Sequence, residues 1–566
     1  MGNRRLLVLV ALLLPPIGIL LLWFRPMPGR RWWQKILARF AGTVGLLILT
    51  GIYLFGVFGM RVEMAGSVPR PIISFGSADA HFDELERQRA AQREAQAPVA
   101  AAMEESPSPT TDEPPSDATP PDATPDVEGE VVEASGDPAS GDSAAGDPAA
   151  GEDSAVEDSA TTLSTTDVAT QDVLPTPEPP APQVEWPGFR GPTGDGRVDG
   201  EIATTWPGGA PPLLWKQRVG LGYSTFVVAH GVAYTLEQRR DQEVVTAYDL
   251  RTGYEHWSQG WTANFEEPMG GDGPRAAPTW DGGELLVLGA EGELRVMRPG
   301  DGSTVWRTNI LEDAQASNIE WGMSAAPVVV DGLVITLPGG TNGASVVAYH
   351  RDSGEIAWKA QNDRQSYTTP EVFTLAGHRQ LVVVSAERAM GLEIADGTRL
   401  WDYPWVTDFD VNAAQPLRVD ENQFFLSAGY DHGAALVRVE ATADGYAAHE
   451  VWQKRTMKNT FSSSVLKDGF VYGLDAEILG CIDVRTGDRQ WKGGRYGSGE
   501  LLLVGDYLVV STEKGEVAIV EARSDRFAEV SRFEAISGKT WNHPVLVDGI
   551  LLVRNHREMA AFDLSP

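Results

Sequence analysis

Ten aromatic, cationic and amide side chains recur through residues 185–566, each close to the start of a short apolar run. These candidate binding residues are Tyr223, Arg275, Trp321, Tyr367, Asn412, Phe461, Tyr496, Trp541, Asn542 and His543. Aromatic rings beside a fixed positive charge and amide or imidazole groups suit the binding of a ligand or a peptide. The alternative is that some of them pack or plug the place where they meet. For Arg275, that alternative is a salt bridge to Glu266 or Glu267, because an enclosed guanidinium needs an anionic partner.

No set of residues in the sequence predicts a known catalytic chemistry. The chain has no GxSxG, HExxH or P-loop motif, and its nine histidines are not paired at metal-ligand spacing. The glycine-rich stretch 190–196 opens no helix, so we expect no phosphate site there. Asp431-His432 and the acidic stretch 408–410 are interpreted as turn and surface residues. We therefore predict no catalytic residue, no metal site and no resident cofactor.

A recurring eleven-residue phrase indicates the elements that position the candidate residues. It reads AYDLRTGYEHW at 247–257 and CIDVRTGDRQW at 481–491, and its other copies lie between these two. A period of roughly 40–50 residues is the length of one four-stranded propeller blade. The tryptophan that ends the phrase can close the outer strand of a blade and pack against the next blade. The blade-closing residues are predicted to be Trp215, Trp257, Trp306, Trp358, Trp401, Trp452 and Trp491.

Asp-Gly pairs between β-branched residues predict the hairpins inside each unit, as in PVVVDGLVIT at 327–336. The units predict an all-β chain folded as an eight-bladed β-propeller over 185–566. The last unit supplies only three strands, and the segment 211–220 offers the fourth, which would close the ring without an open edge. Seven blades are the alternative, because the seventh unit has no turn glycine and carries Phe533 in place of tryptophan.

Residues 1–62 predict a membrane anchor. The stretches 6–24 and 40–60 are uncharged and reach the ~20 residues that a bilayer crossing needs. A re-entrant hairpin is an alternative for the first stretch, whose Pro15-Pro16 pair would kink a helix. Five basic residues in the connecting loop 25–39 place that loop in the cytoplasm. We therefore expect an inner-membrane protein with everything after residue 60 on the periplasmic side.

Residues 63–184 are expected to form a low-complexity acidic tether. Its composition is rich in Pro, Ala, Ser and Asp, and a short exposed helix is predicted near 81–96. Between residues 101 and 185 the chain has 21 Asp or Glu and no Lys or Arg, which accounts for much of its net charge of -33. Nucleic acid is not an expected partner, because phosphate binding requires a basic face.

The repeated AxDxxTGxxxW phrase resembles the tryptophan repeat of PQQ-like (quinoprotein-type) β-propellers, which include the BamB-like proteins. The stretch EWPGFRGPTGDG at 185–196 and the stretches 265–275, 491–497 and 538–546 resemble PQQ-like propellers common in planctomycetes. The resemblance implies an eight-bladed fold and two functions. One is a BamB-like scaffold of the envelope; the other is a quinoprotein oxidoreductase with PQQ and calcium in the channel.

Two departures from that family bear on function. The dehydrogenases place two adjacent disulfide-bonded cysteines against the quinone, whereas this chain has only Cys481. BamB carries a lipidated N-terminal cysteine, whereas this chain has apolar segments. The predicted function is therefore a membrane-anchored scaffold that binds a protein or a ligand, with envelope proteins as partners. The oxidoreductase and a sensor that signals through the membrane segments are the alternatives.

Overall fold

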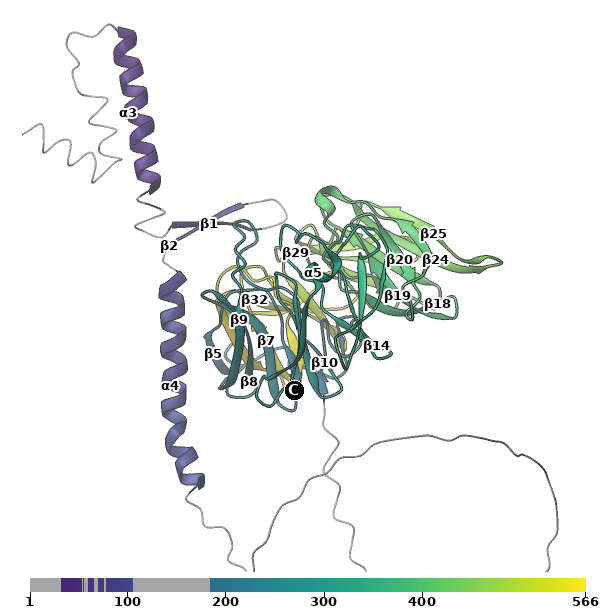
Figure 1. Ribbon diagram of the computed structural model, residues 1–566, viewed down its shortest axis with the longest axis horizontal. Coiled ribbons are helices and arrows are strands. Elements are labelled where there is room, and N and C mark those ends of the chain that lie inside the picture. Colours follow the sequence, from purple (N-terminus) through teal and green to yellow (C-terminus); the bar gives the residue numbers. More distant parts are fainter. Residues whose placement is uncertain (1–31, 53, 55–59, 66–69, 76–77, 105–183) are drawn as a thin grey trace, which may run out of the picture. The chain divides into compact units, whose positions relative to one another are not determined.

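The computed structural model of the chain describes residues 32–52, 54, 60–65, 70–75, 78–104 and 184–566 (Figure 1). Within 184–566 the strands form eight sheets. Their strands are antiparallel neighbours that run from the inner to the outer edge in chain order, except for one parallel inner pair and for the outer strand of the last sheet, which comes from the start of the propeller. The prediction of an eight-bladed propeller is confirmed, and the seven-bladed alternative is wrong.

The first four blades follow one another along the chain. Blade 1 comprises β3 (Val184–Trp186), β6 (Val227–Ala229), β7 (Val232–Arg239), β8 (Gln242–Asp249) and β9 (Glu255–Thr262). Blade 2 comprises β10 (Thr279–Asp281), β11 (Glu284–Leu288), β12 (Glu293–Met297) and β13 (Thr304–Asn309). Blade 3 comprises β14 (Val328–Val330), β15 (Leu333–Thr336), β16 (Val346–His350) and β17 (Ile356–Ala360). Blade 4 comprises β18 (Glu371–Leu375), β19 (His378–Val384), β20 (Arg388–Leu392) and β21 (Arg399–Pro404).

The last four blades include the two that take a strand from the start of the propeller. Blade 5 comprises β22 (Leu417–Arg418), β23 (Gln423–Ala428), β24 (Gly433–Thr442) and β25 (Gly445–Lys454). Blade 6 comprises β26 (Val465–Lys467), β27 (Phe470–Asp475), β28 (Ile478–Asp483) and β29 (Arg489–Arg495). Blade 7 comprises β4 (Arg197–Val198), β30 (Glu500–Val504), β31 (Tyr507–Ser511), β32 (Glu516–Glu521) and β33 (Glu529–Glu534). Blade 8 comprises β34 (Val545–Val547), β35 (Ile550–Arg554), β36 (Glu558–Asp563) and β5 (Leu213–Arg218).

The ring closes inside blade 8, as the sequence predicted. Strand β5 pairs antiparallel with β36, and Trp215 lies opposite Ala561 in the register. The seventh unit is a complete blade although it lacks the glycine and the tryptophan. Its Phe533 is buried and packs edge to face on Phe562 of blade 8 at 5.2 Å between ring centroids. A smaller aromatic ring therefore fills the seam that a tryptophan fills elsewhere.

Buried apolar side chains lie in seams between neighbouring blades, because each sheet is apolar on both faces. In six blades the closing tryptophan contributes directly to this seam. Its Nε1 donates to a backbone carbonyl in the outer turn of the next blade, at 2.8–3.2 Å, in Trp215, Trp257, Trp306, Trp358, Trp452 and Trp491. Trp401 differs, since its Nε1 donates to Gln380 within its own blade while its ring packs on Phe424 of blade 5.

Residues 184–198, which we name the crossing segment, lie inside the ring. Strand β3 pairs with the inner strand β6 of blade 1, whereas β4 pairs in parallel with the inner strand β30 of blade 7. Between them, Pro187 O accepts a hydrogen bond from Trp280 N of blade 2. Arg190 donates to Ser464 O beside blade 6. The crossing segment therefore fills the middle of the channel.

The described residues before the propeller form two helices and a hairpin. Helix α3 spans Trp32–Ile52, β1 (Met60–Ala65) pairs with β2 (Arg70–Phe75), and α4 spans Ala78–Glu104. Of the described residues, none belongs to a helix that combines the length and the apolarity needed to cross a membrane. The stretch 6–24 lies outside the described residues, and α3 includes 40–52 of the second predicted span. The expectation of an exposed helix near 81–96 is wrong for one face of α4, where Phe82, Leu85 and Arg89 are buried.

Candidate functional site

A cavity of about 580 Å³ opens where the inner strands surround the crossing segment. Seven of the ten candidate residues line it, from six different blades: Tyr223, Arg275, Trp321, Tyr367, Phe461, Trp541 and His543. They meet because each precedes the inner strand of its blade, and all inner strands begin at the same end of the channel.

The other three candidate residues serve the packing of the blades. Asn412 is buried, and its Nδ2 donates to Ser385 O at 2.8 Å. Asn542 donates from its Nδ2 to Ser224 O at 2.9 Å. Tyr496 lies in the core between blades 6 and 7, where its hydroxyl donates to Glu529. These three residues therefore match the alternative given for the candidate residues, which is that some of them pack the fold and do not bind a ligand.

Several cavity residues were not anticipated from the sequence. They come from the crossing segment, from loops and from an inner strand: Phe189, Met269, Glu320, Phe409, Gln415, Tyr430 and Glu500. Of these residues, only Phe189 has a recognisable signal in the sequence. It directly precedes the glycine-rich stretch 190–196, which carries the backbone across the channel. Nothing local in the sequence distinguishes the other six from ordinary loop or strand residues.

Aromatic side chains from five blades form the wall of the cavity. The ring centroids of Trp321 and Tyr367 lie 5.5 Å apart, and those of Phe461 and Trp541 lie 5.0 Å apart. The ring centroid of Tyr223 lies 5.5 Å from that of Trp541, so Tyr223 extends this second aromatic pair. Such tilted aromatic contacts hold one another in place, so the wall presents rigid apolar faces.

Arg275 is held by its own loop. Its guanidinium donates to Gly271 O at 2.7 Å and to Gly273 O at 2.8 Å. It lies 4.0 Å from the Glu267 carboxylate, which is the salt-bridge partner that the sequence analysis offered as the alternative. The guanidinium also lies over the Tyr223 ring at 5.5 Å. Arg275 therefore shapes the mouth of the cavity by ordering residues 265–275.

Three buried side chains at the floor of the cavity hold polar atoms that have no hydrogen-bond partner among the described residues. These atoms are Oε1 of Gln415, Oε2 of Glu500 and Nε2 of His543. The three residues are 4%, 6% and 4% exposed. Nδ1 of His543 faces Pro544 O at 2.8 Å and must donate to it, which leaves Nε2 as an acceptor. The floor is therefore built to accept hydrogen bonds from a group inside the cavity.

Arg190 of the crossing segment lies between two carboxyl groups of the channel. It is buried and donates to Ser464 O at 2.6 Å and to Asp195 O at 2.9 Å. Burial raises the pKa of Glu371 and of Glu500 to about 8, although the Arg190 charge opposes the shift. Burial, with the Arg190 charge, lowers the pKa of His543 to about 3. The floor is therefore largely uncharged at neutral pH.

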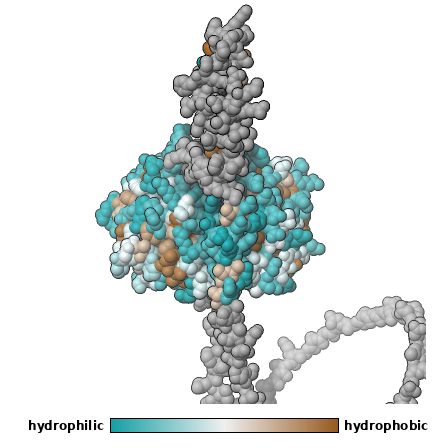
Figure 2. Space-filling view, turned by 90° about the vertical axis from the view of Figure 1, so that its left-hand side faces the viewer, coloured by the Kyte–Doolittle hydropathy of each residue, from teal (hydrophilic) through white to brown (hydrophobic). Residues whose placement is uncertain are grey.

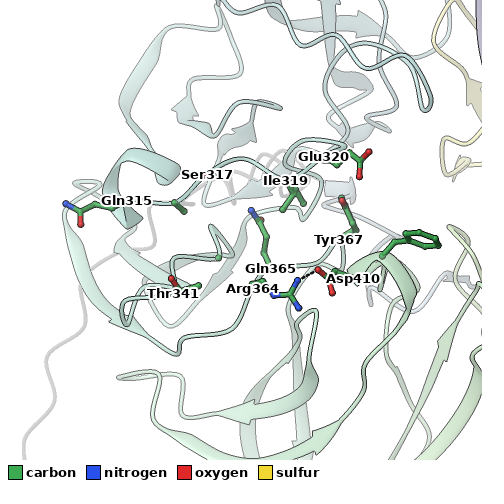
Figure 3. Close-up of a pocket in the computed structure, with 12 residues that line it drawn as sticks. Gln315, Ser317, Ile319, Glu320, Thr341, Arg364, Gln365, Tyr367 and Asp410 are labelled. Atoms are coloured by element: carbon green, nitrogen blue, oxygen red, sulfur yellow. Dashed lines mark hydrogen bonds and ion pairs between the residues drawn. The ribbon is translucent and has the colours of Figure 1, made fainter.

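A second cavity of about 430 Å³ adjoins the first and shares Glu320, Tyr367 and Phe409 with it. Figure 3 shows Arg364 turned toward Asp410, with which it forms an ion pair at the base of this pocket. Phe409 lines both cavities, and 75% of the residue is exposed. Its φ of 63° is unfavourable for a residue with a Cβ, so the loop holds this ring outward at an energetic cost.

Asp431 and His432, which the sequence indicated as turn and surface residues, line a separate open pocket of about 670 Å³. Asp431 pairs with Arg455 at 3.1 Å and with Lys458 at 3.0 Å. His432 packs edge to face on Trp405 at 4.3 Å. Across the part of the chain that the structure describes, no three His, Cys, Asp or Glu side chains are grouped to hold a metal ion. The face of the molecule in Figure 2 is mainly hydrophilic, with small separate hydrophobic areas.

Eight blades, tryptophans that close the seams and a crossing segment in the channel define this chain as an eight-bladed β-propeller protein. Over part of its length it is similar to the PQQ-like protein BamB. The family model for outer membrane protein assembly factor BamB matches residues 240–493, which lie in blades 1 to 6. Outer membrane protein assembly factor BamB of Escherichia coli (strain K12) is 29% identical over 146 residues. That match covers 25% of this chain and 34% of the relative, so the chain spans about a third of the relative's length.

Two solved structures are similar at low identity. BamB from Moraxella catarrhalis is 12% identical, with a TM-score of 0.45 over 62% of this chain and 100% of its own. Quinohemoprotein alcohol dehydrogenase from Comamonas testosteroni is 13% identical, with a TM-score of 0.47 over 67% of this chain and 80% of its own.

Proposed function

We propose that this chain is a protein- or ligand-binding scaffold of the cell envelope and that the 580 Å³ cavity is its binding site. The observation that carries the proposal is the floor, where Gln415, Glu500 and His543 each present a buried polar atom without a partner among the described residues. A buried acceptor left without a donor costs about 1–3 kcal/mol, so a group that satisfies it gains that amount.

The chemistry of the cavity selects the kind of group that enters. The wall is aromatic, which favours an apolar or planar group over a hydrated ion. The cations Arg275 and Lys539 already lie over the rings of Tyr223 and Trp541, so these faces are partly occupied. In the uncharged floor, Gln415 Oε1 and His543 Nε2 can accept N–H or O–H donors, and the protonated Glu500 carboxyl can also donate. We expect a neutral donor such as a backbone or side-chain amide of a partner segment.

Site-specific crosslinking in the envelope tests this proposal. A photoreactive phenylalanine replaces Trp321 at the cavity wall or, as the control, Val305 on the outer strand β13. We expect a crosslinked product from position 321 that is absent from position 305 and that weakens when Gln415 is changed to Leu. An equal yield at both positions, or no response to Gln415→Leu, would contradict the cavity as the binding site.

The oxidoreductase alternative is not favoured. A quinone with calcium needs a group of metal donors, and among the described residues no such group of acidic, histidine or cysteine side chains is present. Cys481 is a single buried thiol in blade 6. We expect calorimetric titration of the full chain in detergent with PQQ and calcium to show no binding. Micromolar binding of PQQ and calcium that Gln415→Leu abolishes would instead support the oxidoreductase alternative.

Our proposal includes inner-membrane anchoring with the propeller on the periplasmic side. It rests on the uncharged stretches 6–24 and 40–60 and on the basic loop between them. Similarity to BamB supports an envelope location and envelope proteins as partners. An alkaline phosphatase reporter fused after residue 183 should be active, because that enzyme needs an oxidising compartment. An inactive reporter of normal abundance would contradict this orientation.

A further inference from the structure

Helix α4 packs against the propeller at the seam where the ring closes. Phe82 and Leu85, 4% and 1% exposed, form an apolar cluster with Leu221, which lies between β5 of blade 8 and β6 of blade 1. The described residues of α4 up to Pro98 belong to the same compact unit as the propeller. The apolar face of α4 therefore covers the junction of the first and last blades.

A buried arginine joins α4 to both blades. Arg89 is 2% exposed, and its Nε lies 2.8 Å from the Glu255 carboxylate of blade 1. Its two terminal nitrogens donate to Gln217 Oε1 at 2.7 Å and to Arg218 O at 2.8 Å, both on β5 of blade 8. Its guanidinium also lies over the Tyr248 ring at 5.0 Å. A guanidinium is removed from water in this way only where its partners are specific.

Two further contacts extend the interface along the first half of α4. His81 Nε2 donates to Val219 O at 2.8 Å, and Arg218 donates to His81 Nδ1 at 3.1 Å. On the exposed edge, Arg240 forms ion pairs with three acidic residues of α4, which are Asp79, Asp83 and Glu86. The interface thus combines an apolar centre, a buried charge pair and a polar rim, which is the composition of a specific contact.

We propose that α4 is a clasp, an N-terminal helix that locks the ring closure and fixes the propeller to the segment that precedes it. Under this proposal the chain leaves the propeller at the end of α4 and returns to it at β3, so the distance between anchor and propeller does not depend on the length of the acidic run 105–183. If residues before 60 anchor the chain, as we propose above, the stretch 53–77 alone sets the distance from the membrane.

Cleavage of the full chain in detergent tests the clasp without relying on the anchor. A specific protease site is inserted between Gly141 and Asp142, and the cleaved protein is passed over a sizing column. We expect the N-terminal fragment to elute with the propeller fragment. Separation of the two fragments in the otherwise unchanged protein would overturn the proposal.

Matched substitutions on α4 show whether the co-elution comes from the clasp. Arg89→Ala and Leu85→Asp remove the buried contacts, whereas Arg87→Ala changes a side chain that is 73% exposed. We expect the first two to raise the released fraction by at least about tenfold, since a lost charged hydrogen bond changes an equilibrium by that order. Arg87→Ala should release no more than the parent. Equal release from all three variants would overturn the clasp. The propeller sequence is the same in every variant, so the circular dichroism spectrum of the propeller should also be the same, and a changed spectrum would reveal a variant that has not folded.

Discussion

The indole of Trp306, at the end of blade 2, lies directly on Gly354 in the outer turn of blade 3. Its Nε1 donates to Arg351 O at 2.8 Å, and a Cβ added to Gly354 would come within 2.5 Å of the ring. The same pairing joins Trp257 to Gly302, in the seam before it. The repeated tryptophan and glycine are therefore the two halves of one contact between neighbouring blades.

Gly354→Ala should destabilise the propeller more than an alanine at an open glycine. Its φ is 73°, so alanine adds backbone strain and also overlaps the Trp306 ring. Gly332 in the same blade has a φ of 77° and nothing near its Cβ position, which makes it a matched control. We expect overpacking at 354 to add about 1–3 kcal/mol to the cost seen at 332. Urea denaturation of both variants measures this difference, and equal midpoints would contradict the seam contact.

Arg190→Ala should weaken the propeller strongly. The substitution removes the hydrogen bonds that the buried guanidinium donates to Asp195 O and Ser464 O. Each hydrogen bond from a charged group contributes about 1.5–3 kcal/mol, whereas a change at an exposed residue costs within about 0.5 kcal/mol. Arg197→Ala, at an exposed position on β4, is the control. Thermal unfolding of the two variants tests this expectation, which fails if their midpoints agree.

Stability should fall as pH rises from about 4.5 to about 8. Burial raises the pKa of Glu371 and Glu500 from 4.5 to about 8, so the folded protein keeps protons that the unfolded chain has lost. The stabilisation is complete below about pH 4.5 and is lost as pH rises through about 8. Glu500→Gln cannot ionise and should lose less stability over this range. Melting temperatures measured against pH check this, and parallel curves for both proteins would contradict it.

Phe409 should contribute to partner binding and not to stability. Its ring is exposed and its backbone has a φ of 63°, a conformation that glycine adopts without strain. We expect Phe409→Gly to raise the free energy of unfolding by up to about 1 kcal/mol and to weaken crosslinking from position 321. Phe409→Ala should weaken crosslinking equally without the gain in stability. Undiminished crosslinking in both variants would show that the ring takes no part in binding.

The repeat unit and most of the cavity wall could be predicted from the sequence. Each blade is a local structure of hairpins, so Asp-Gly turns and the closing tryptophans predict it from neighbouring residues alone. The same periodicity placed Tyr223, Trp321 and Phe461 at one end of the channel. The eighth blade also followed, because the segment 211–220 supplies the strand that the last unit lacks.

The sequence could not predict which polar groups are buried or where the helix before the propeller lies, because both depend on contacts between distant segments. Gln415 and Glu500 become floor residues because strands from distant blades converge on the crossing segment. That convergence produces no periodic pattern in the sequence. Helix α4 has a charged composition typical of an exposed helix, yet Arg89 is buried because Glu255 and β5 provide its partners. A contact between residues so far apart along the chain depends on the closed ring, which no local pattern describes.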